Sequence, residues 1–121
     1  LQGMANLVTL LLLSVGVTAV AAGGAYGLDT IGGISSSTFS CMKNSGYSFY
    51  IGRVGQSNGG IDQGGISNMR NAWSGGFSYV DAYIFPCVTC STSAAAQTQN
   101  TINALRNAGV KFGTLWLDVE R

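Results

Sequence analysis

The sequence predicts an α/β fold built on a parallel sheet, and two patterns support this prediction. Four strand-like segments alternate with three helix-like segments along residues 26–120, as in βαβ units whose strands run parallel. The later strands carry aliphatic side chains at every second position, with polar or aromatic side chains between them. A doubly wound sheet, covered by helices on both faces, would need two aliphatic faces. The pattern therefore favours a modified TIM-like (β/α) barrel, of which this chain holds the first four strands.

Two strands and a short helix come first. Residues 26–30 form a short strand that ends near Asp29. A glycine- and serine-rich segment then leads into a short helix, which Gly46 stops. Residues 49–54 are the second strand, because β-branched and aromatic side chains dominate them. Asp29 is thus predicted at the carboxyl end of a strand, where a barrel has its mouth.

The second helix is predicted from a buried stripe. Trp73 recurs at helical spacing with Ile66 and Met69, and a glycine pair ends the segment. This spacing places Trp73 in the core. Asp62 and Asn68 are interpreted as turn and helix-start residues, outside the site.

The third strand, residues 79–85, has two chemically different faces. One face is aliphatic and suited to lie under helices, while the other is polar and aromatic. We expect Asp81 to pair with Arg53, because strand parity points both side chains at the same interior. The aliphatic set is Val80, Ala82 and Ile84, and the polar-aromatic set is Tyr79, Asp81, Tyr83 and Phe85.

A longer helix separates the third and fourth strands. It is predicted over residues 93–107, with Thr98, Ile102 and Leu105 as its buried stripe. The loop before it holds two cysteines.

The fourth strand, residues 112–120, is uncharged until its last positions, where Asp118 and Glu120 flank one valine. Because side chains alternate along a strand, Trp116, Asp118 and Glu120 are expected to share one face. In glycoside hydrolysis two neighbouring carboxyl groups are needed, one to protonate the leaving oxygen and one to stabilise the sugar cation. The competing interpretation is a strand end that simply runs into solvent.

Composition narrows the classes of function. The net charge of +1 provides no basic patch, so nucleic acid is not an expected partner. The chain has no histidine, which excludes Ser-His-Asp and Cys-His catalysis within it and removes the commonest zinc ligand. We therefore expect no cofactor and no metal.

The amino-terminal residues have the pattern of a secretory signal. Residues 7–22 are apolar with few interruptions, which is short for a membrane span, and small residues follow. Residues 1–25 are predicted to be upstream residues plus a signal peptide, cleaved near Ala22 or Ala25. The protein is then secreted, or delivered to a lysosomal or phagosomal lumen, with no membrane contact after cleavage. A membrane anchor is the alternative.

The chain has three cysteines, Cys41, Cys87 and Cys90. Thiols of secreted chains usually pair, and an odd number leaves one without a partner. Cys87 and Cys90 are interpreted as disulfide cysteines of a loop, with partners left open. A redox or metal-binding CxxC pair is the weaker alternative.

Three segments in this order and spacing, residues 26–29, 79–87 and 115–120, resemble the glycoside hydrolase 25 family of lysozymes, in particular its animal and protist branch. The resemblance implies a modified (β/α) barrel that hydrolyses the β-1,4 bond between N-acetylmuramic acid and N-acetylglucosamine in bacterial peptidoglycan. A chitinase-like barrel is the nearest enzymatic rival, but it typically carries another Asp where this chain has Trp116. A secreted carbohydrate-binding or defence protein without turnover is the rival of a different class.

The resemblance also implies roles for individual residues. Glu120 is expected to be the general acid, and Asp118 the stabilising or nucleophilic carboxylate. Asp29 is a third acidic group at the barrel mouth, and Tyr83 a sugar contact. Trp116 either fills the barrel or forms part of a sugar-stacking floor. Strands five to eight of such a barrel are absent, so residues 26–121 are predicted to be an amino-terminal half that is inactive alone.

Overall fold

The computed structural model describes residues 24–120. The four strands form one parallel sheet in the order β1-β2-β3-β4, which confirms the predicted α/β alternation. Along the described chain this sheet is open, so a closed barrel remains a prediction. The signal-peptide prediction falls almost wholly outside these residues. The elements are β1 (Tyr26–Asp29), α1 (Ser36–Asn44), β2 (Tyr47–Gly55), α2 (Gln63–Ser74), β3 (Tyr79–Ile84), α3 (Ala94–Asn107) and β4 (Leu115–Leu117).

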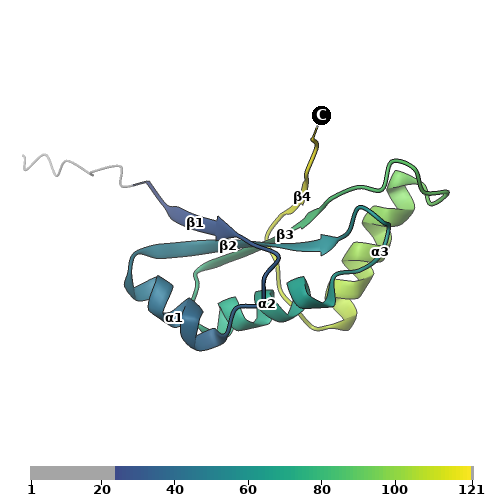
Figure 1. Ribbon diagram of the computed structural model, residues 1–121. Coiled ribbons are helices and arrows are strands. Elements are labelled where there is room, and N and C mark those ends of the chain that lie inside the picture. Colours follow the sequence, from purple (N-terminus) through teal and green to yellow (C-terminus); the bar gives the residue numbers. More distant parts are fainter. Residues whose placement is uncertain (1–23, 121) are drawn as a thin grey trace, which may run out of the picture.

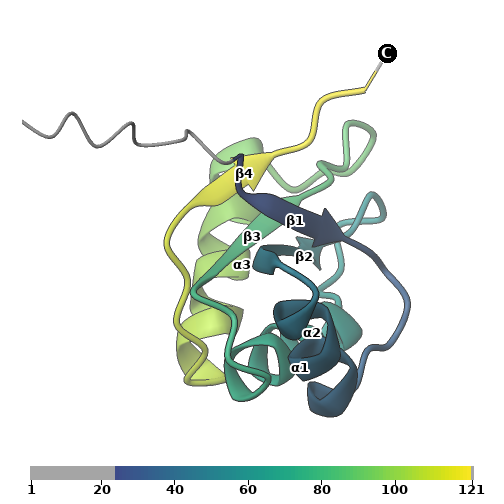
Figure 2. The ribbon, with the colours of Figure 1, turned by 90° about the vertical axis from the view of Figure 1, so that its left-hand side faces the viewer.

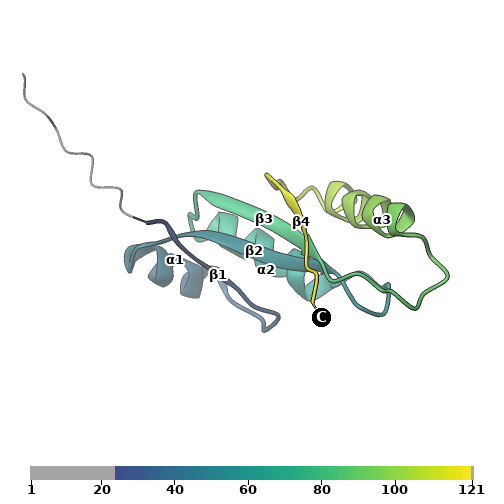
Figure 3. The same cartoon turned by 90° about the horizontal axis from the view of Figure 1, so that it is seen from above.

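The helices pack on one face of the sheet. In two side views α1 and α2 lie below the strands (Figure 1 and Figure 2), and from above the strands lie over them (Figure 3). The aliphatic side chains of β3 are buried between the sheet and the helices, as predicted. Among residues 24–120, no helix is long and apolar enough to cross a membrane. Buried core side chains include Phe39, Tyr50, Val54, Ile66, Met69, Val80, Ala82 and Leu105.

Each helix begins at a side-chain cap and is soon followed by a glycine with positive φ. A cap oxygen satisfies one backbone N–H of the first turn, and glycine adopts positive φ without strain. These signals explain why the helices could be located from the sequence. The caps are Ser35, Asp62 and Ser93, and the glycines are Gly46, Gly76 and Gly109.

Two burial predictions are wrong. Trp73 is 38% exposed; it lies in the last turn of α2, and its indole donates to the carbonyl of Lys111 in the segment before β4. In α3 the buried residues are Gln97, Thr101 and Leu105, and Thr98 is exposed. The polar Gln97 is buried because its amide bonds with the backbone of the preceding loop, so hydrophobicity alone does not identify the stripe.

Candidate functional site

A shallow hollow lies at the carboxyl ends of the strands, on the face that the described helices leave bare. Its volume is about 270 Å³. All four strands contribute to it, which is what a parallel sheet allows. The lining residues are Asp29, Ile51, Tyr83, Trp116, Leu117 and Asp118.

Strand register brings the central residues together. Tyr83 is paired with Arg53 of β2 on one side and with Trp116 of β4 on the other. Neighbouring strands lie about 4.8 Å apart, so these three side chains are neighbours on one face. Past the end of β4, the backbone N–H of Asp118 still donates to the carbonyl of Ile84 at 2.9 Å. Asp118 is therefore held at the rim by main-chain pairing.

Asp29 is positioned from beneath by β2. The hydroxyl of buried Tyr50 donates to the carbonyl of Thr30 at 3.2 Å, directly after Asp29. Burial raises the pKa of Tyr50, so this hydroxyl keeps its proton. At Gly27 an added Cβ would clash with the ring of Phe49, so a larger residue there would have to displace that ring.

The loop after β1 is held by a residue whose role was missed. Asn68 lies inside α2 and is 2% exposed, so its assignment as a helix-start residue is wrong. Its Nδ2 donates to the carbonyl of Gly32 at 2.7 Å, and its Oδ1 accepts from the N–H of Ile34 at 2.9 Å. The sequence contains a signal for this role, because Asn68 directly precedes the apolar Met69 on the buried side of the helix.

Arg53 pairs with Asp62, so the predicted pair with Asp81 is wrong. Arg53 donates from Nε and Nη2 to Asp62 Oδ2, at 2.9 and 2.7 Å. The other oxygen of Asp62 accepts from the N–H of Gly65, which makes it the predicted turn residue and the cap of α2. Burial acts to raise the pKa of Asp62, but the hydrogen bonds from Arg53 and Gly65 outweigh it and hold the pKa below its usual value.

Asp81 lies two residues before Tyr83 on β3 and is paired with Ile51 of β2. From there it reaches β4: Oδ1 accepts from the N–H of Thr114 at 2.9 Å, and Oδ2 from the indole Nε1 of Trp116 at 2.8 Å. Trp116 is 51% exposed, with one edge of its indole fixed and a face left free. Within residues 24–120 it therefore forms an exposed wall of the hollow.

The hollow is acidic around Tyr83. Burial raises the pKa of the Tyr83 hydroxyl; Arg53 opposes this, while Asp29, Asp118 and Asp62 raise it further. The hydroxyl thus remains protonated at neutral pH and can donate a hydrogen bond to a ligand.

Glu120 stands apart from these residues. β4 ends at Leu117, shorter than the predicted strand, and the following chain leaves the sheet (Figure 1 and Figure 2). Glu120 is exposed and does not line the hollow, whereas Asp118 does. Among the described residues the acidic groups that share the hollow are therefore Asp29 and Asp118.

A family model described as "Lysozyme-like protein 1" matches residues 20–121. The chain belongs to this lysozyme-like family. The expected relationship to lysozymes of glycoside hydrolase family 25 is confirmed by the names of its relatives.

Three relatives illustrate the relationship. The chain is 47% identical to "Lysozyme-like protein 5" of Caenorhabditis elegans, over 78% of this chain and 45% of that protein. It is 37% identical to "Probable GH family 25 lysozyme 2" of Dictyostelium discoideum, over 78% and 44%. It is 33% identical to "Counting factor 45-1" of Dictyostelium discoideum, over 77% and 32%. The chain spans less than half the length of these relatives. No solved structure matches it.

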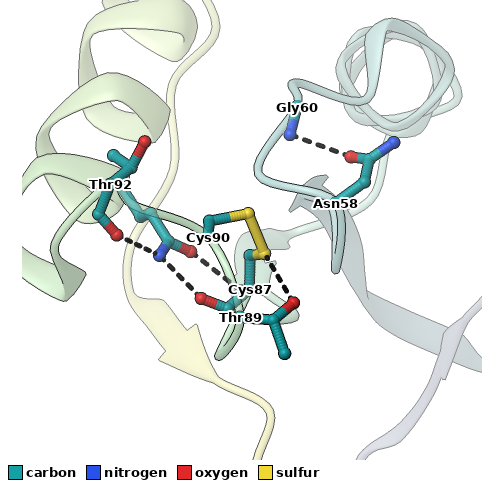
Figure 4. The surroundings of a disulfide bond; sticks show 7 residues. Asn58, Gly60, Cys87, Thr89, Cys90 and Thr92 are labelled. Carbon is teal, nitrogen blue, oxygen red and sulfur yellow. Dashed lines mark hydrogen bonds between the residues drawn. A yellow bond between two sulfur atoms is a disulfide. The ribbon is translucent and has the colours of Figure 1, made fainter.

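The lysozyme-like chain closes its β3–α3 loop with a disulfide between Cys87 and Cys90 (Figure 4). The interpretation as disulfide cysteines is confirmed, and their partners are each other. Gln97 fixes the loop, accepting from the N–H of Cys87 at 2.9 Å and donating to its carbonyl at 3.0 Å. Cys41 is exposed and forms no disulfide within the described part of the chain. An added Cβ on Gly59 would lie 3.1 Å from Cys90 Sγ, so the disulfide also packs against the β2–α2 turn.

Proposed function

We propose that this chain supplies the first half of a lysozyme that hydrolyses the β-1,4 bond between N-acetylmuramic acid and N-acetylglucosamine in bacterial peptidoglycan. One observation carries the proposal: Asp29 and Asp118, from the two outer strands, line one hollow together with Tyr83 and Trp116. Carboxylates beside aromatic and hydroxyl groups are the equipment of glycoside hydrolysis. Membership of a lysozyme-like family supports the same chemistry.

Each residue has a role in this proposal. Glu120 is the general acid that protonates the leaving oxygen, and Asp118 stabilises or attacks the sugar cation. Asp29 is the third acidic group facing the substrate. Tyr83 donates its hydroxyl proton to a sugar oxygen. Trp116 offers the free face of its fixed indole as a floor for a sugar ring.

The cleft of this proposal needs a second wall. The hollow is open on its far side, and the chain spans less than half the length of its relatives. The second wall would come from residues that follow Arg121 in a longer protein, and residues 26–121 alone would have no turnover. A disulfide in the described chain supports an oxidising compartment, and hence secretion or delivery to a lysosomal or phagosomal lumen.

The test uses the longest natural protein product that contains this chain, incubated with purified peptidoglycan. We expect soluble glycan fragments from the wild type. Glu120→Gln should release them at least about 100-fold more slowly, because general acid catalysis contributes 10² to 10⁴ in rate. Asp118→Asn should cause a similar loss.

Lys43→Gln, at the far end of α1, is the matched control and should retain wild-type turnover. Equal rates for the wild type and Glu120→Gln would overturn the assignment of the general acid.

A secreted carbohydrate-binding protein without turnover is the second candidate. It is favoured by the position of Glu120 outside the hollow. It predicts that the wild type sediments with peptidoglycan but releases no fragments. Retained binding by Glu120→Gln would then be uninformative, whereas loss of binding in Trp116→Ala would locate the binding surface at the hollow.

A further inference from the structure

A basic and aromatic groove lies at the opposite, amino edge of the sheet. It consists of two adjoining hollows of about 210 and 400 Å³, which share Trp73 and Lys111. The smaller hollow reaches Tyr79 at the start of β3, and the larger one reaches Arg70 of α2. The larger hollow is in the size range that holds small ligands.

Two of the side chains that line the groove, those of Trp73 and Arg70, are fixed in place. The indole Nε1 of Trp73 donates to the carbonyl of Lys111 at 2.8 Å, which leaves the indole 38% exposed. Arg70 donates from Nη2 to the carbonyl of Ala108 at 2.6 Å. Because these contacts use main-chain partners, the aromatic face and the guanidinium are arranged before any ligand arrives.

Most charged residues of 24–120 separate between the two edges, except Arg53, which pairs with Asp62, and Asp81, which lines the smaller hollow. Both oxygens of Asp81 accept hydrogen bonds, from Thr114 and Trp116. Two cations, Arg70 and Lys111, line the groove against this one acid, so its lining is net positive. The cations of this edge are Lys43, Arg70, Arg106 and Lys111, and the acids of the carboxyl edge are Asp29, Asp62, Asp118 and Glu120.

We propose that the groove binds an acidic saccharide. The sugar ring would stack its C–H groups on the electron-rich face of Trp73, while the carboxylate or phosphate of the ligand meets Lys111 and Arg70. A neutral sugar would leave both cations unused, and a bare anion would leave the indole unused. This site is separate from the hollow at the carboxyl edge and does not depend on the proposed function.

The chain has two tryptophans, one at each edge. The indole N–H signal of Trp73 reports the groove directly, whereas that of Trp116 senses it only through Asp81, to which this N–H donates. The full chain labelled with ¹⁵N is titrated with digalacturonic acid, glucose 6-phosphate, chitotriose and inorganic phosphate, and Trp73→Phe assigns the signals. We expect one or both acidic sugars to shift the Trp73 signal to saturation. If only digalacturonic acid shifts the Trp73 signal, the groove selects a carboxylate. If only glucose 6-phosphate shifts it, the groove selects a phosphate. Either result supports the proposal.

Lys111→Gln tests the charge contact, because the hydrogen bond that holds Trp73 uses the carbonyl of Lys111 and not its side chain. It should weaken binding about tenfold, the loss of one charge-assisted contact. Lys43→Gln, a cation of the same edge that does not line the groove, should bind as the wild type does. The proposal is overturned if neither acidic sugar shifts the Trp73 signal, or if chitotriose or inorganic phosphate shifts it as strongly. An unchanged affinity in Lys111→Gln, or a response confined to Trp116, also overturns it.

Discussion

The two edges of the sheet each present one tryptophan, but in opposite electrostatic settings. At the carboxyl edge the indole of Trp116 is tied to Asp81, and acidic side chains surround the hollow beside it. At the amino edge the indole of Trp73 is tied to a carbonyl, and Arg70 and Lys111 line the groove. The same aromatic group thus lies among side chains of opposite charge at the two edges.

The separation follows from the βαβ order. Parallel strands all end at one edge, and the helices between them end at the other. A cation in the last turn of a helix is stabilised by the helix dipole, as Lys43 and Arg106 are. Acids placed after strands and cations placed at helix ends therefore collect at opposite edges. The fold can offer two chemically distinct surfaces without extra elements.

The largest effect is expected where one change disturbs both edges. Gly65 lies at the start of α2, and an added Cβ would clash with the carbonyl oxygen of Arg53. Gly65→Ala must push α2 away from β2, which should cost about 3 kcal/mol of unfolding free energy. Urea unfolding measures it.

Gly33→Ala is the matched control, since nothing lies within 4 Å of the added Cβ. A loss as small in Gly65→Ala as in Gly33→Ala would contradict the close packing of α2 on the sheet.

A smaller effect, confined to the carboxyl edge, is expected from Asp62→Asn. Asparagine still caps α2, but the charged pair with Arg53 is lost, which should cost about 2 kcal/mol at pH 7. The folded pKa of Asp62 lies below the unfolded value of 3.8. The stability from this pair is therefore complete above the unfolded pKa and is lost as the pH falls through the folded pKa.

Urea unfolding at pH 7 and at pH 2.5 tests this dependence. The difference between wild type and Asp62→Asn should shrink at the lower pH. A difference that is the same at both values would mean that the charge of Asp62 contributes nothing.

Asp81→Asn is expected to disturb Trp116 more than Trp73. The asparagine oxygen can still accept from Thr114, but its amide nitrogen cannot accept from the indole of Trp116. We expect a loss of about 1.5 kcal/mol, and a Trp116 indole signal that moves further than that of Trp73. Equal movement of the two signals in a ¹⁵N spectrum would show that Asp81 does not hold Trp116.

The smallest effect is expected from Tyr50→Phe. It removes the hydrogen bond to the carbonyl of Thr30 behind Asp29, at a cost of about 1 kcal/mol. Tyr26→Phe, whose side chain is exposed, is the control and should leave thermal stability unchanged. No difference between the two variants would argue against support of Asp29 by Tyr50.

The elements were predictable because their signals are local. Caps, glycine stops and alternation in β3 each involve residues close in sequence, and they agree with one another. The burial of Trp73 was mispredicted because helical spacing gives the side of a helix but not how deeply a residue of its last turn is covered. The polar stripe of α3 was missed because Gln97 is buried by its bonds to a loop, which no periodicity shows.

The site was predictable in part. Asp29, Tyr83 and Asp118 follow from strand parity and from the meeting of parallel strand ends. The Arg53–Asp62 pair could not be predicted from strand parity. It depends on the β2–α2 turn, in which the N–H of Asp62 donates to the carbonyl of Val54. Strand alternation could not predict the position of Glu120, because β4 ends at Leu117.

The identity of the new sugar end shows which glycosidic bond of peptidoglycan is cleaved. Peptidoglycan is digested with the longest natural protein product that contains this chain, and the fragments are reduced with borohydride and hydrolysed. We expect the reduced sugar to be the alcohol of muramic acid, and Glu120→Gln to yield almost none. The alcohol of glucosamine, or no reduced sugar from the wild type, would overturn the assignment as a lysozyme.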